Sequence, residues 1–411
     1  MDTLTINQDR LWDSLMEMAQ FGATKKGGCA RLALTDLDKQ GRHLFIKWCE
    51  DAGCTVTVDQ VGNIFALRPG KNMNLPPVGT GSHLDTQPTG GKFDGVFGVL
   101  SGVEVLRTLQ ENNIVTEAPI EVSVWTNEEG SRFAPAMMGS GVVSGRLDLD
   151  TVLATKDIDG ITVGEELERI GFAGDVSATQ RAYTAFFETH IEQGPYLENE
   201  GKIIGVVTGG QGQRWYDVIL TGRESHAGTT PMHLRKDALL AATKLVQKVE
   251  MIANAHKPGC GTVGFLQVIP NSRNTIPGQI KMGVDLRHPN DESLSEMDAE
   301  LKAYLDALGK ETGCEIELDP YWYYAPVVFN KDCIAAVAEG ADLHGYNHMD
   351  IIAGAGHDAC YVADYAPTSM IFTPCLDGIS HNEIESTTIE ECNAGCNVLL
   401  HAMVKMAKRL A

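Results

Sequence analysis

Several short segments of this 411-residue sequence combine histidine with carboxylate side chains at spacings that suit a metal site. In GSHLDT, His83 can bind a metal ion while Asp85 accepts the other ring N–H and fixes the tautomer. Such a His-x-Asp pair also arises often by chance. In GGKFDG, Asp94 stands between glycines just before a helical pattern. It is either the N-cap of that helix or a carboxylate that bridges two ions, since glycines let the backbone crowd a metal centre.

Three further segments add candidate ligands. Glu128 and Glu129 follow an apolar run in WTNEEG, where they either line a solvated loop or divide the roles of metal ligand and general base. His190 in HIEQGP and His381 in ISHNE each resemble an ordinary histidine when taken alone. Together these side chains form the nitrogen and oxygen set that zinc or a similar divalent ion prefers. Two ions about 3.5–4 Å apart can share a water and lower its pKa toward neutrality.

Alternating helical and strand patterns position these segments. The first half predicts helices at 8–21, 36–52 and 96–110, and strands at 54–58, 63–67, 77–81, 120–125 and 184–188. The alternation indicates an α/β domain with a mixed, largely parallel sheet flanked by helices. The candidate side chains lie at predicted strand ends or in loops, and open α/β sheets build their sites at the carboxyl ends of strands.

A second unit is predicted over residues 209–324, where the pattern is strand, helix, strand, strand, helix, strand. The strands are expected at 214–220, 261–268, 279–286 and 315–318, and the helices at 235–255 and 291–308. We expect an inserted α+β lid with a four-stranded antiparallel sheet and two helices. The α/β pattern then resumes, so residues 1–208 and 325–411 form a discontinuous catalytic domain.

Composition excludes several classes of function. The net charge is −22 and no Lys/Arg cluster is present, which argues against nucleic acid and against an anionic membrane surface. The first ten residues lack the apolar core of a signal peptide, and no run approaches the ~20 apolar residues needed to span a bilayer. The ten cysteines form no CxxC pair, which favours reduced thiols in a cytoplasmic protein.

Taken in order, the motifs resemble those of the dinuclear zinc amidohydrolases. That family includes N-carbamoyl-L-amino-acid hydrolases, allantoate amidohydrolases and yeast-type β-alanine synthase (β-ureidopropionase), within the aminoacylase and carboxypeptidase superfamily. The resemblance runs from about residue 8 to the C-terminus, through GSHLDT, GGKFDG, NEEGSRF, HIEQGP, SHAGTTP, NTIPG, DLRHP, GAGHDA and ISHNE. It implies two divalent ions, zinc by expectation with Mn, Co or Ni as alternatives, and a homodimer formed through the lid.

The resemblance also implies roles for individual residues. One metal would be held by His83, Asp94 and His190, and Asp94 would bridge to a second metal held by Glu129 and His381. The expected catalytic residues are Glu128 as general base and acid, Asp85 as the residue that orients His83, and His226 as the donor to the oxyanion, often from the partner subunit. The expected substrate contacts are Gln193, Arg214, Asn274, Arg287, Gly356 and His357. By residue type alone, His226 and Arg287 would be ordinary surface residues.

The implied reaction is hydrolysis of the ureido C–N bond of an N-carbamoyl amino acid, giving the amino acid, ammonia and carbon dioxide. The segments HLDTQP and LSGVEVLR look particularly like β-alanine synthase and favour N-carbamoyl-β-alanine, although bacterial L-carbamoylases share much of them. The alternatives are an allantoate amidohydrolase and a peptidase or N-acyl amino acid deacylase of the same superfamily. An alternative of another class is a catalytically dead binding homologue, which would be marked by lost ligands.

Overall fold

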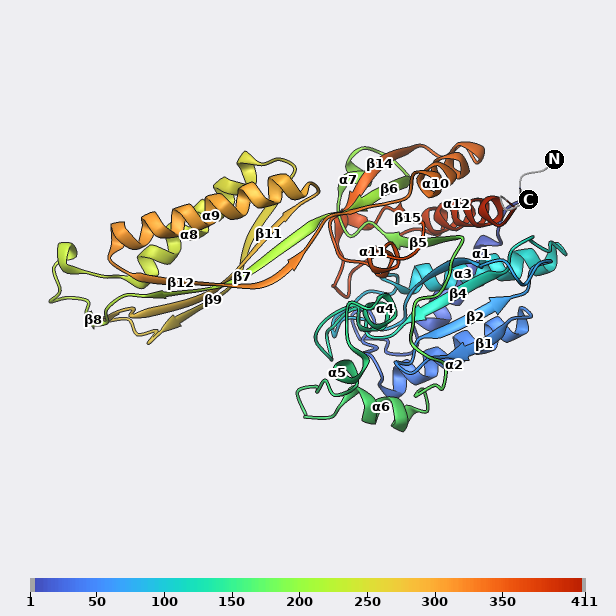
Figure 1. The fold of residues 1–411 in the computed structure, drawn as a ribbon, viewed down its shortest axis with the longest axis horizontal. Coiled ribbons are helices and arrows are strands. Elements are labelled where there is room, and N and C mark those ends of the chain that lie inside the picture. Colours follow the sequence, from blue (N-terminus) through green and yellow to red (C-terminus); the bar gives the residue numbers. More distant parts are fainter. Residues whose placement is uncertain (1–3, 409–411) are drawn as a thin grey trace. The chain divides into compact units, whose positions relative to one another are not determined.

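The structure, a computed structural model, describes residues 4–408 and divides into two compact units. The first unit runs to Thr208 and resumes at Phe329, and the second comprises Gly209–Val328. In the sequence colours of Figure 1, the second unit is the light green, yellow and orange insertion between the two parts of the first.

A nine-stranded sheet forms the centre of the first unit (Figure 1). Its order is β1-β2-β4-β3-β5-β15-β6-β13, and β14 pairs with β6. The edge strand β13 is formed by the last two residues before the chain re-enters the first unit. The four strands β4, β3, β5 and β15 run parallel, while the outer pairs are antiparallel. This confirms the predicted mixed sheet. The strands are β1 (Thr55–Val58), β2 (Ile64–Arg68), β3 (Val78–His83), β4 (Ile120–Trp125), β5 (Ala185–Ile191), β6 (Ile204–Gly210), β13 (Val327–Val328), β14 (His348–Ala353) and β15 (Thr368–Thr373).

Helices cover both faces of this sheet. Along β2, Ile64 and Ala66 join one apolar core, whereas Phe65 between them joins another, because successive strand residues point to opposite faces. The first core includes residues of α1 (Gln8–Met18), α2 (Asp36–Asp51), α3 (Val96–Glu111), α10 (Lys331–Leu343) and α12 (Ile389–Lys408). The second core includes Val143 of α4 (Met138–Ser144) and Val362 of α11 (Asp358–Val362).

Some short elements were not predicted from the sequence. These include the helices α5 (Leu149–Leu153), α6 (Val163–Ile170) and α7 (Tyr196–Asn199), and the one-turn helices η1 (Met232–Leu234) and η2 (Leu376–Gly378). Each is too short to establish a helical apolar period in sequence. Within residues 4–408, no helix has the length and apolar character that a membrane span requires. The ten cysteines form no disulfide, and Cys260 is the exposed one among them.

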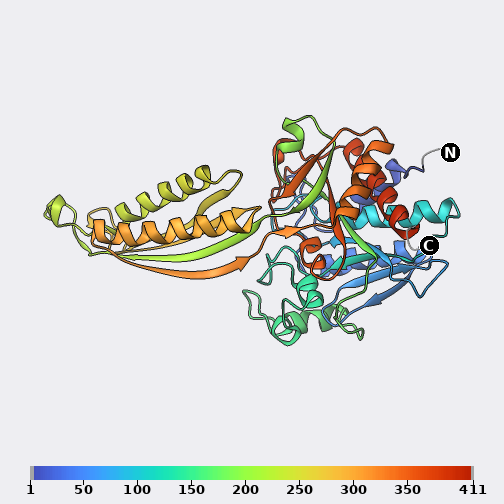
Figure 2. The ribbon, with the colours of Figure 1, turned by 45° about the horizontal axis from the view of Figure 1, so that its top comes forward.

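The second unit contains a four-stranded antiparallel sheet in the order β12-β7-β11-β9, with α8 and α9 on one side of it (Figure 2). This confirms the predicted architecture of the insert. Its elements are β7 (Gly212–Thr221), β8 (Ser225–His226), α8 (Ala238–Ala255), β9 (Cys260–Ile269), β10 (Thr275–Ile276), β11 (Gln279–His288), α9 (Asp291–Thr312) and β12 (Glu315–Tyr324). The predicted end of the last strand at Leu318 is wrong. Pro320 does not stop β12, because β12 is an edge strand and its register shifts at that point.

Candidate metal centre

The parallel strands bring the candidate ligands of the first unit to one edge of the sheet. His83 ends β3, His190 is the penultimate residue of β5, and Glu128 and Glu129 follow the end of β4. These three strands are neighbours and run in the same direction, so their carboxyl ends lie together. The order of strands, rather than the order of the sequence, therefore assembles the cluster.

Asp94 lies between two groups of candidate ligand atoms. Its Oδ1 is 3.5 Å from Nε2 of His83 and 3.2 Å from Nε2 of His190. Its Oδ2 is 3.6 Å from Nε2 of His381, and that nitrogen is 3.4 Å from Oε2 of Glu129. Two potential ligand groups, one buried and one partly exposed, thus share Asp94. Directing one oxygen to each group is the arrangement of a bridging carboxylate.

The residue after Asp94 has to be glycine. Gly95 has a φ of +66°, and a Cβ there would lie 2.3 Å from the Nε2 atom of His83. Its N–H donates to Nε2 of His190 at 3.1 Å. Gly95, without a side-chain hydrogen bond, is the N-cap of α3, so the interpretation of Asp94 as that cap is wrong.

Main-chain carbonyl groups fix the tautomers of the two buried histidines. Nδ1 of His83 lies 2.8 Å from the carbonyl oxygen of Asp85, and Nδ1 of His190 lies 2.8 Å from that of Ile191. Because a carbonyl only accepts, each Nδ1 carries the proton and each Nε2 can ligate a metal. The expectation that the Asp85 carboxylate accepts the His83 proton is wrong. That carboxylate instead accepts the main-chain N–H of Glu128 at 3.3 Å and of the next residue at 3.2 Å.

Burial and neighbouring charges shift the pKa values of the acidic groups. Burial raises the pKa of Glu128 well above its usual range, and the charge of Asp358 adds to this effect. Burial also raises the pKa of Glu129 to about 8, with Asp94 adding to it. Burial opposes ionisation of Asp94, but the histidines, His190 foremost, outweigh it and hold that pKa well below its usual range. Because Glu128 is 8% exposed and the Glu129 side chain 4%, the alternative of a solvated loop is wrong.

The donor set of the centre fits divalent metal ions. Within residues 4–408, the groups within ion-pair distance of Asp94, Glu128 and Glu129 are the histidines described above. Neutral imidazoles do not balance three crowded carboxylates, and buried charge is costly unless it is compensated. Divalent cations would supply the compensating charge, and mixed imidazole and carboxylate donors suit zinc and similar ions.

Glu188 is a buried acid near the centre that the sequence patterns did not single out. Glu188, His190 and His357 also come within ligand distance of one another. However, Glu188 accepts hydrogen bonds from Ser82 Oγ at 2.7 Å and from Ala359 N at 2.8 Å. Its oxygens are therefore already engaged, and we assign it to the support of the centre. Its sequence signal was an acid inside the otherwise largely apolar strand AFFETHI.

Three predicted substrate contacts of the first unit lie beside the centre or its neighbours. The amide of Gln193 donates to Oδ2 of Asp94 at 2.7 Å. His357 is buried with its ring centroid 4.6 Å from that of His190, and burial lowers its pKa well below the usual range. Gly356 faces Met137, whose Cε would lie 3.1 Å from a Cβ at that glycine. Their contact with a substrate stays a prediction.

Two predicted residues of the second unit, His226 and Asn274, lie close together. Nδ1 of His226 accepts the N–H groups of Gly228 at 3.0 Å and Thr229 at 3.2 Å. The ring proton is therefore on Nε2, and the side chain is exposed. The pairing of β8 with β10 places the Asn274 segment alongside, where its carbonyl accepts the Ala227 N–H at 2.9 Å.

Two further predicted contacts, Arg287 and Arg214, have partners within the second unit. Arg287 of β11 donates from Nη2 to Asp285 at 2.8 Å and from Nε at 3.0 Å. The guanidinium of Arg214 stacks 4.3 Å from the ring centroid of Tyr323 and donates to Ser295 Oγ at 3.3 Å. Substrate binding by either arginine stays a prediction.

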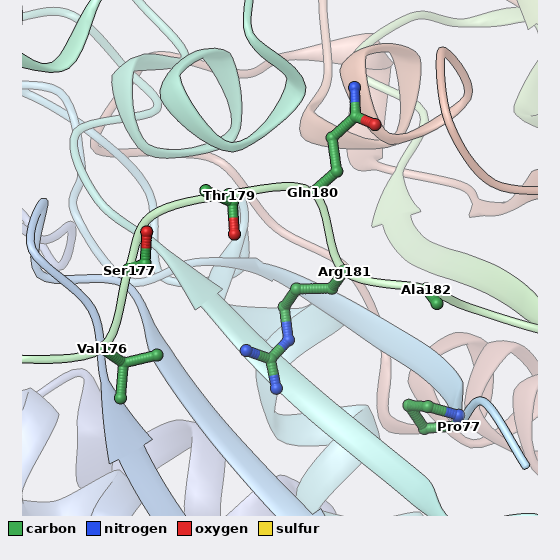
Figure 3. A pocket seen from close by; sticks show the side chains of 7 residues that line it. All are labelled: Pro77, Val176, Ser177, Thr179, Gln180, Arg181 and Ala182. Carbon is green, nitrogen blue, oxygen red and sulfur yellow. The ribbon is translucent and has the colours of Figure 1, made fainter. Parts of the chain in front are cut away.

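A cavity of about 340 Å³ lies at the opposite end of the same sheet (Figure 3). Its lining comes from the residue before β3 and from the segment that leads to β5, and comprises Pro77, Val176, Ser177, Thr179, Gln180, Arg181 and Ala182. Gln180 and Arg181 point to opposite sides of their loop in Figure 3. Arg181 forms a 2.6 Å ion pair with Glu121, which compensates the charge of the guanidinium group. The lining residues precede β3 and β5, whereas the metal ligands lie at or after the ends of these strands, so the cavity is separate from the metal centre.

Comparison with known proteins establishes the family. Residues 79–405 match peptidase family M20/M25/M40. The chain belongs to this family. An N-carbamoyl-L-amino-acid amidohydrolase of Rhizobium meliloti is 48% identical over 98% of this chain and 97% of its own. An allantoate amidohydrolase of Bacillus subtilis is 32% identical over 97% of this chain and 98% of its own.

A solved structure gives the same assignment. A hydantoinase/carbamoylase family amidase of Burkholderia multivorans shares 57% identity, with a TM-score of 0.95 over 98% of both chains. These matches confirm the family predicted from the motifs. This M20/M25/M40 family member is therefore a hydrolase that acts on C–N bonds of amides. The family depends on metal, and the candidate ligand groups described above agree with this requirement.

Proposed function

We propose that the protein hydrolyses the ureido C–N bond of an N-carbamoyl amino acid, with two divalent metal ions at the candidate centre. The observation that carries the substrate class is the 48% identity, over nearly the full length of both chains, to the Rhizobium meliloti N-carbamoyl-L-amino-acid amidohydrolase. The position of Asp94, with one oxygen toward each ligand group, supports two ions rather than one. We propose zinc for both, with Mn, Co and Ni as alternatives.

In this proposal Glu128 moves the proton. When bound, the metal ions would polarise the ureido carbonyl and lower the pKa of the attacking water. Glu128 lies in the centre, with Oε2 3.4 Å from Nε2 of His83, and takes a proton from the water as its oxygen attacks the carbonyl carbon. It then donates that proton to the leaving nitrogen. The C–N bond breaks, the amino acid leaves, and the carbamic acid product decomposes to ammonia and carbon dioxide.

We propose that the lid supplies the contacts that select the substrate. The protonated Nε2 of His226 suits a donor to the oxyanion, which such donors stabilise by roughly 3–4 kcal/mol in other enzymes. Asn274 and Arg287 are proposed to bind the substrate carboxylate, since a guanidinium fork matches a carboxylate.

The lid is also proposed to form a homodimer. Its edge strand β9 and helix α8 expose large apolar side chains, namely Leu240, Met251, Phe265 and Leu266. Exposed apolar side chains on an edge strand support this proposal, because the free edge of a sheet is available for pairing with another chain. Light scattering tests this proposal. A dimer that dissociates in Phe265→Glu would support it, and a monomeric wild-type protein would reject it.

The first candidate substrate is an N-carbamoyl amino acid, for which two kinds come into question. The Rhizobium meliloti relative favours N-carbamoyl-L-α-amino acids, and the HLDTQP segment favours N-carbamoyl-β-alanine. Allantoate is the second candidate, because the Bacillus subtilis relative named for it matches almost the whole chain. A peptide or N-acyl amino acid lacks the ureido group and is not expected to release ammonia.

The test uses metal-stripped protein resupplied with zinc or manganese. Ammonia and free amine are measured with N-carbamoyl-L-methionine, N-carbamoyl-β-alanine, allantoate and a dipeptide. We expect metal-dependent ammonia release from a carbamoyl amino acid, and none from Glu128→Gln despite full metal content. Ammonia from allantoate alone would transfer the protein to the second candidate. Amine release from the dipeptide without ammonia would refute the proposed substrate class.

A further inference from the structure

Glu385 is a buried acid that contacts the centre without belonging to either ligand group. It is 3% exposed, and its Oε1 accepts the main-chain N–H of Phe93 at 3.0 Å and of Asp94 at 3.1 Å. Its Oε2 lies 3.0 Å from Oγ of Ser380. The same hydroxyl lies 2.6 Å from Oδ2 of Asp94. Glu385 thus holds the backbone of Asp94 and adjoins the hydroxyl that contacts its carboxylate.

These contacts join two loops that are distant in sequence. Asp94 belongs to the loop between β3 and α3, whereas Ser380 and His381 belong to the loop between β15 and α12. Gly91 of GGKFDG accommodates the join, because a Cβ there would lie 2.0 Å from Oε1 of Glu385 and 2.5 Å from its Cβ. The second glycine of this motif is therefore required by the side chain of Glu385.

The second ligand group depends on this join more than the first. His83 and His190 belong to hydrogen-bonded central strands, which fix their positions. His381 lies in a loop with a φ of +54°, and its side chain is 52% exposed. The 3.6 Å separation of His381 Nε2 and Asp94 Oδ2 spans the two loops, so any slack between the loops changes that separation directly.

We propose that Glu385 is a positioning residue that sets the second metal group by holding the Asp94 loop against the His381 loop. This inference rests on the proposed two-metal centre and names a residue on which the geometry of its second metal group depends. Loss of a residue that orients ligands typically weakens metal affinity by about 10–100-fold. We expect a loss of that size for the second ion and a smaller loss for the first, because both ions share Asp94 but His83 and His190 are fixed by their strands.

The test titrates metal-free protein with Zn²⁺ and measures the stoichiometry and affinity of both sites, without substrate. Glu385→Asp keeps the charge but retracts the carboxylate by about 1.5 Å, one carbon–carbon bond. Glu385→Gln keeps the length and an oxygen for the two N–H groups. The matched control is Glu383→Ala, on the same loop, whose partner is Lys26 at 3.2 Å. Circular dichroism and Tm of the metal-free proteins verify folding.

We expect Glu385→Asp to bind the second ion about 10–100-fold more weakly and to lose less affinity for the first. Glu385→Gln and Glu383→Ala should bind both ions with near wild-type affinity. Equal weakening of both ions in Glu385→Asp, or wild-type affinity for both, would overturn the positioning role. If Glu385→Asp does not fold, Ser380→Ala takes its place, and unchanged affinity for the second ion would then overturn the role. A wild-type protein that binds fewer than two ions would instead reject the proposed centre itself.

Discussion

Substitution of Asp85 by Asn is expected to lower kcat while leaving intact the metal group of His83, Asp94 and His190. The Asp85 carboxylate accepts the N–H groups of Glu128 at 3.3 Å and Glu129 at 3.2 Å, one on each oxygen. Asn retains one oxygen, so one N–H would face an NH₂ donor. A hydrogen bond to a charged group contributes about 1.5–3 kcal/mol. If all of this free energy serves to place Glu128, kcat falls by about 10–150-fold, since about 1.4 kcal/mol corresponds to tenfold.

Metal content distinguishes a role of the Asp85 carboxylate in placing Glu128 from a role in orienting His83. The main-chain carbonyl of Asp85 accepts the His83 proton at 2.8 Å, and Asn keeps that carbonyl. We would measure kcat, KM and bound metal in Asp85→Asn. Asp148→Asn is the control, because Asp148 accepts a main-chain N–H at 2.9 Å at the start of α5 on the surface. A loss of the ion held by His83, Asp94 and His190 that parallels the loss of activity would refute the reasoning and would assign the Asp85 carboxylate to the orientation of His83.

Three other perturbations have defined outcomes. Gly95→Ala is expected to abolish tight metal binding, because the added Cβ would lie 2.3 Å from the His83 ring at a φ of +66°. Calorimetric titration with Zn²⁺ checks this expectation, and wild-type affinity would contradict the geometry. Leu301→Ala removes a fully buried side chain from the core of the second unit and should lower its free energy of unfolding by about 2–5 kcal/mol. Urea unfolding measures this change, and a decrease of under about 1 kcal/mol would contradict that packing. A thiol reagent should modify Cys260 first in the native protein, since the other nine cysteines are buried or half-buried; mass spectrometry of the labelled protein checks the order.

Periodic patterns were sufficient for the main elements of the fold. The spacing of apolar residues predicted a helix at 96–110, and the structure has α3 at Val96–Glu111. The predicted strand at 120–125 matches β4. The pattern failed where elements are short or where an edge strand passes a proline, as at Pro320 in β12. Local periodicity reports burial on one face and contains no information on pairing between strands.

The types and neighbours of the candidate ligands were also readable from sequence. Glycines around Asp94, paired acids after an apolar run and histidines after strands all marked the segments that the structure brings together. The sequence did not single out Glu188 or Glu385. Their importance comes from hydrogen bonds to residues that lie far away along the chain, such as that from Ala359 N to Glu188 and that from Asp94 N to Glu385.

The available chemical groups, and the segments in which they occur, depend on residue type and local spacing and can therefore be read from the sequence. The interactions between these groups depend on the fold. In the folded protein, the Nδ1–H of His83 donates to the carbonyl of Asp85, and the Asp85 carboxylate accepts the main-chain N–H of Glu128. The fold also directs the two oxygens of Asp94 to different histidines. The physical reason is that hydrogen bonds and charge compensation act over a few ångströms in space, where strand order and loop packing set the distances.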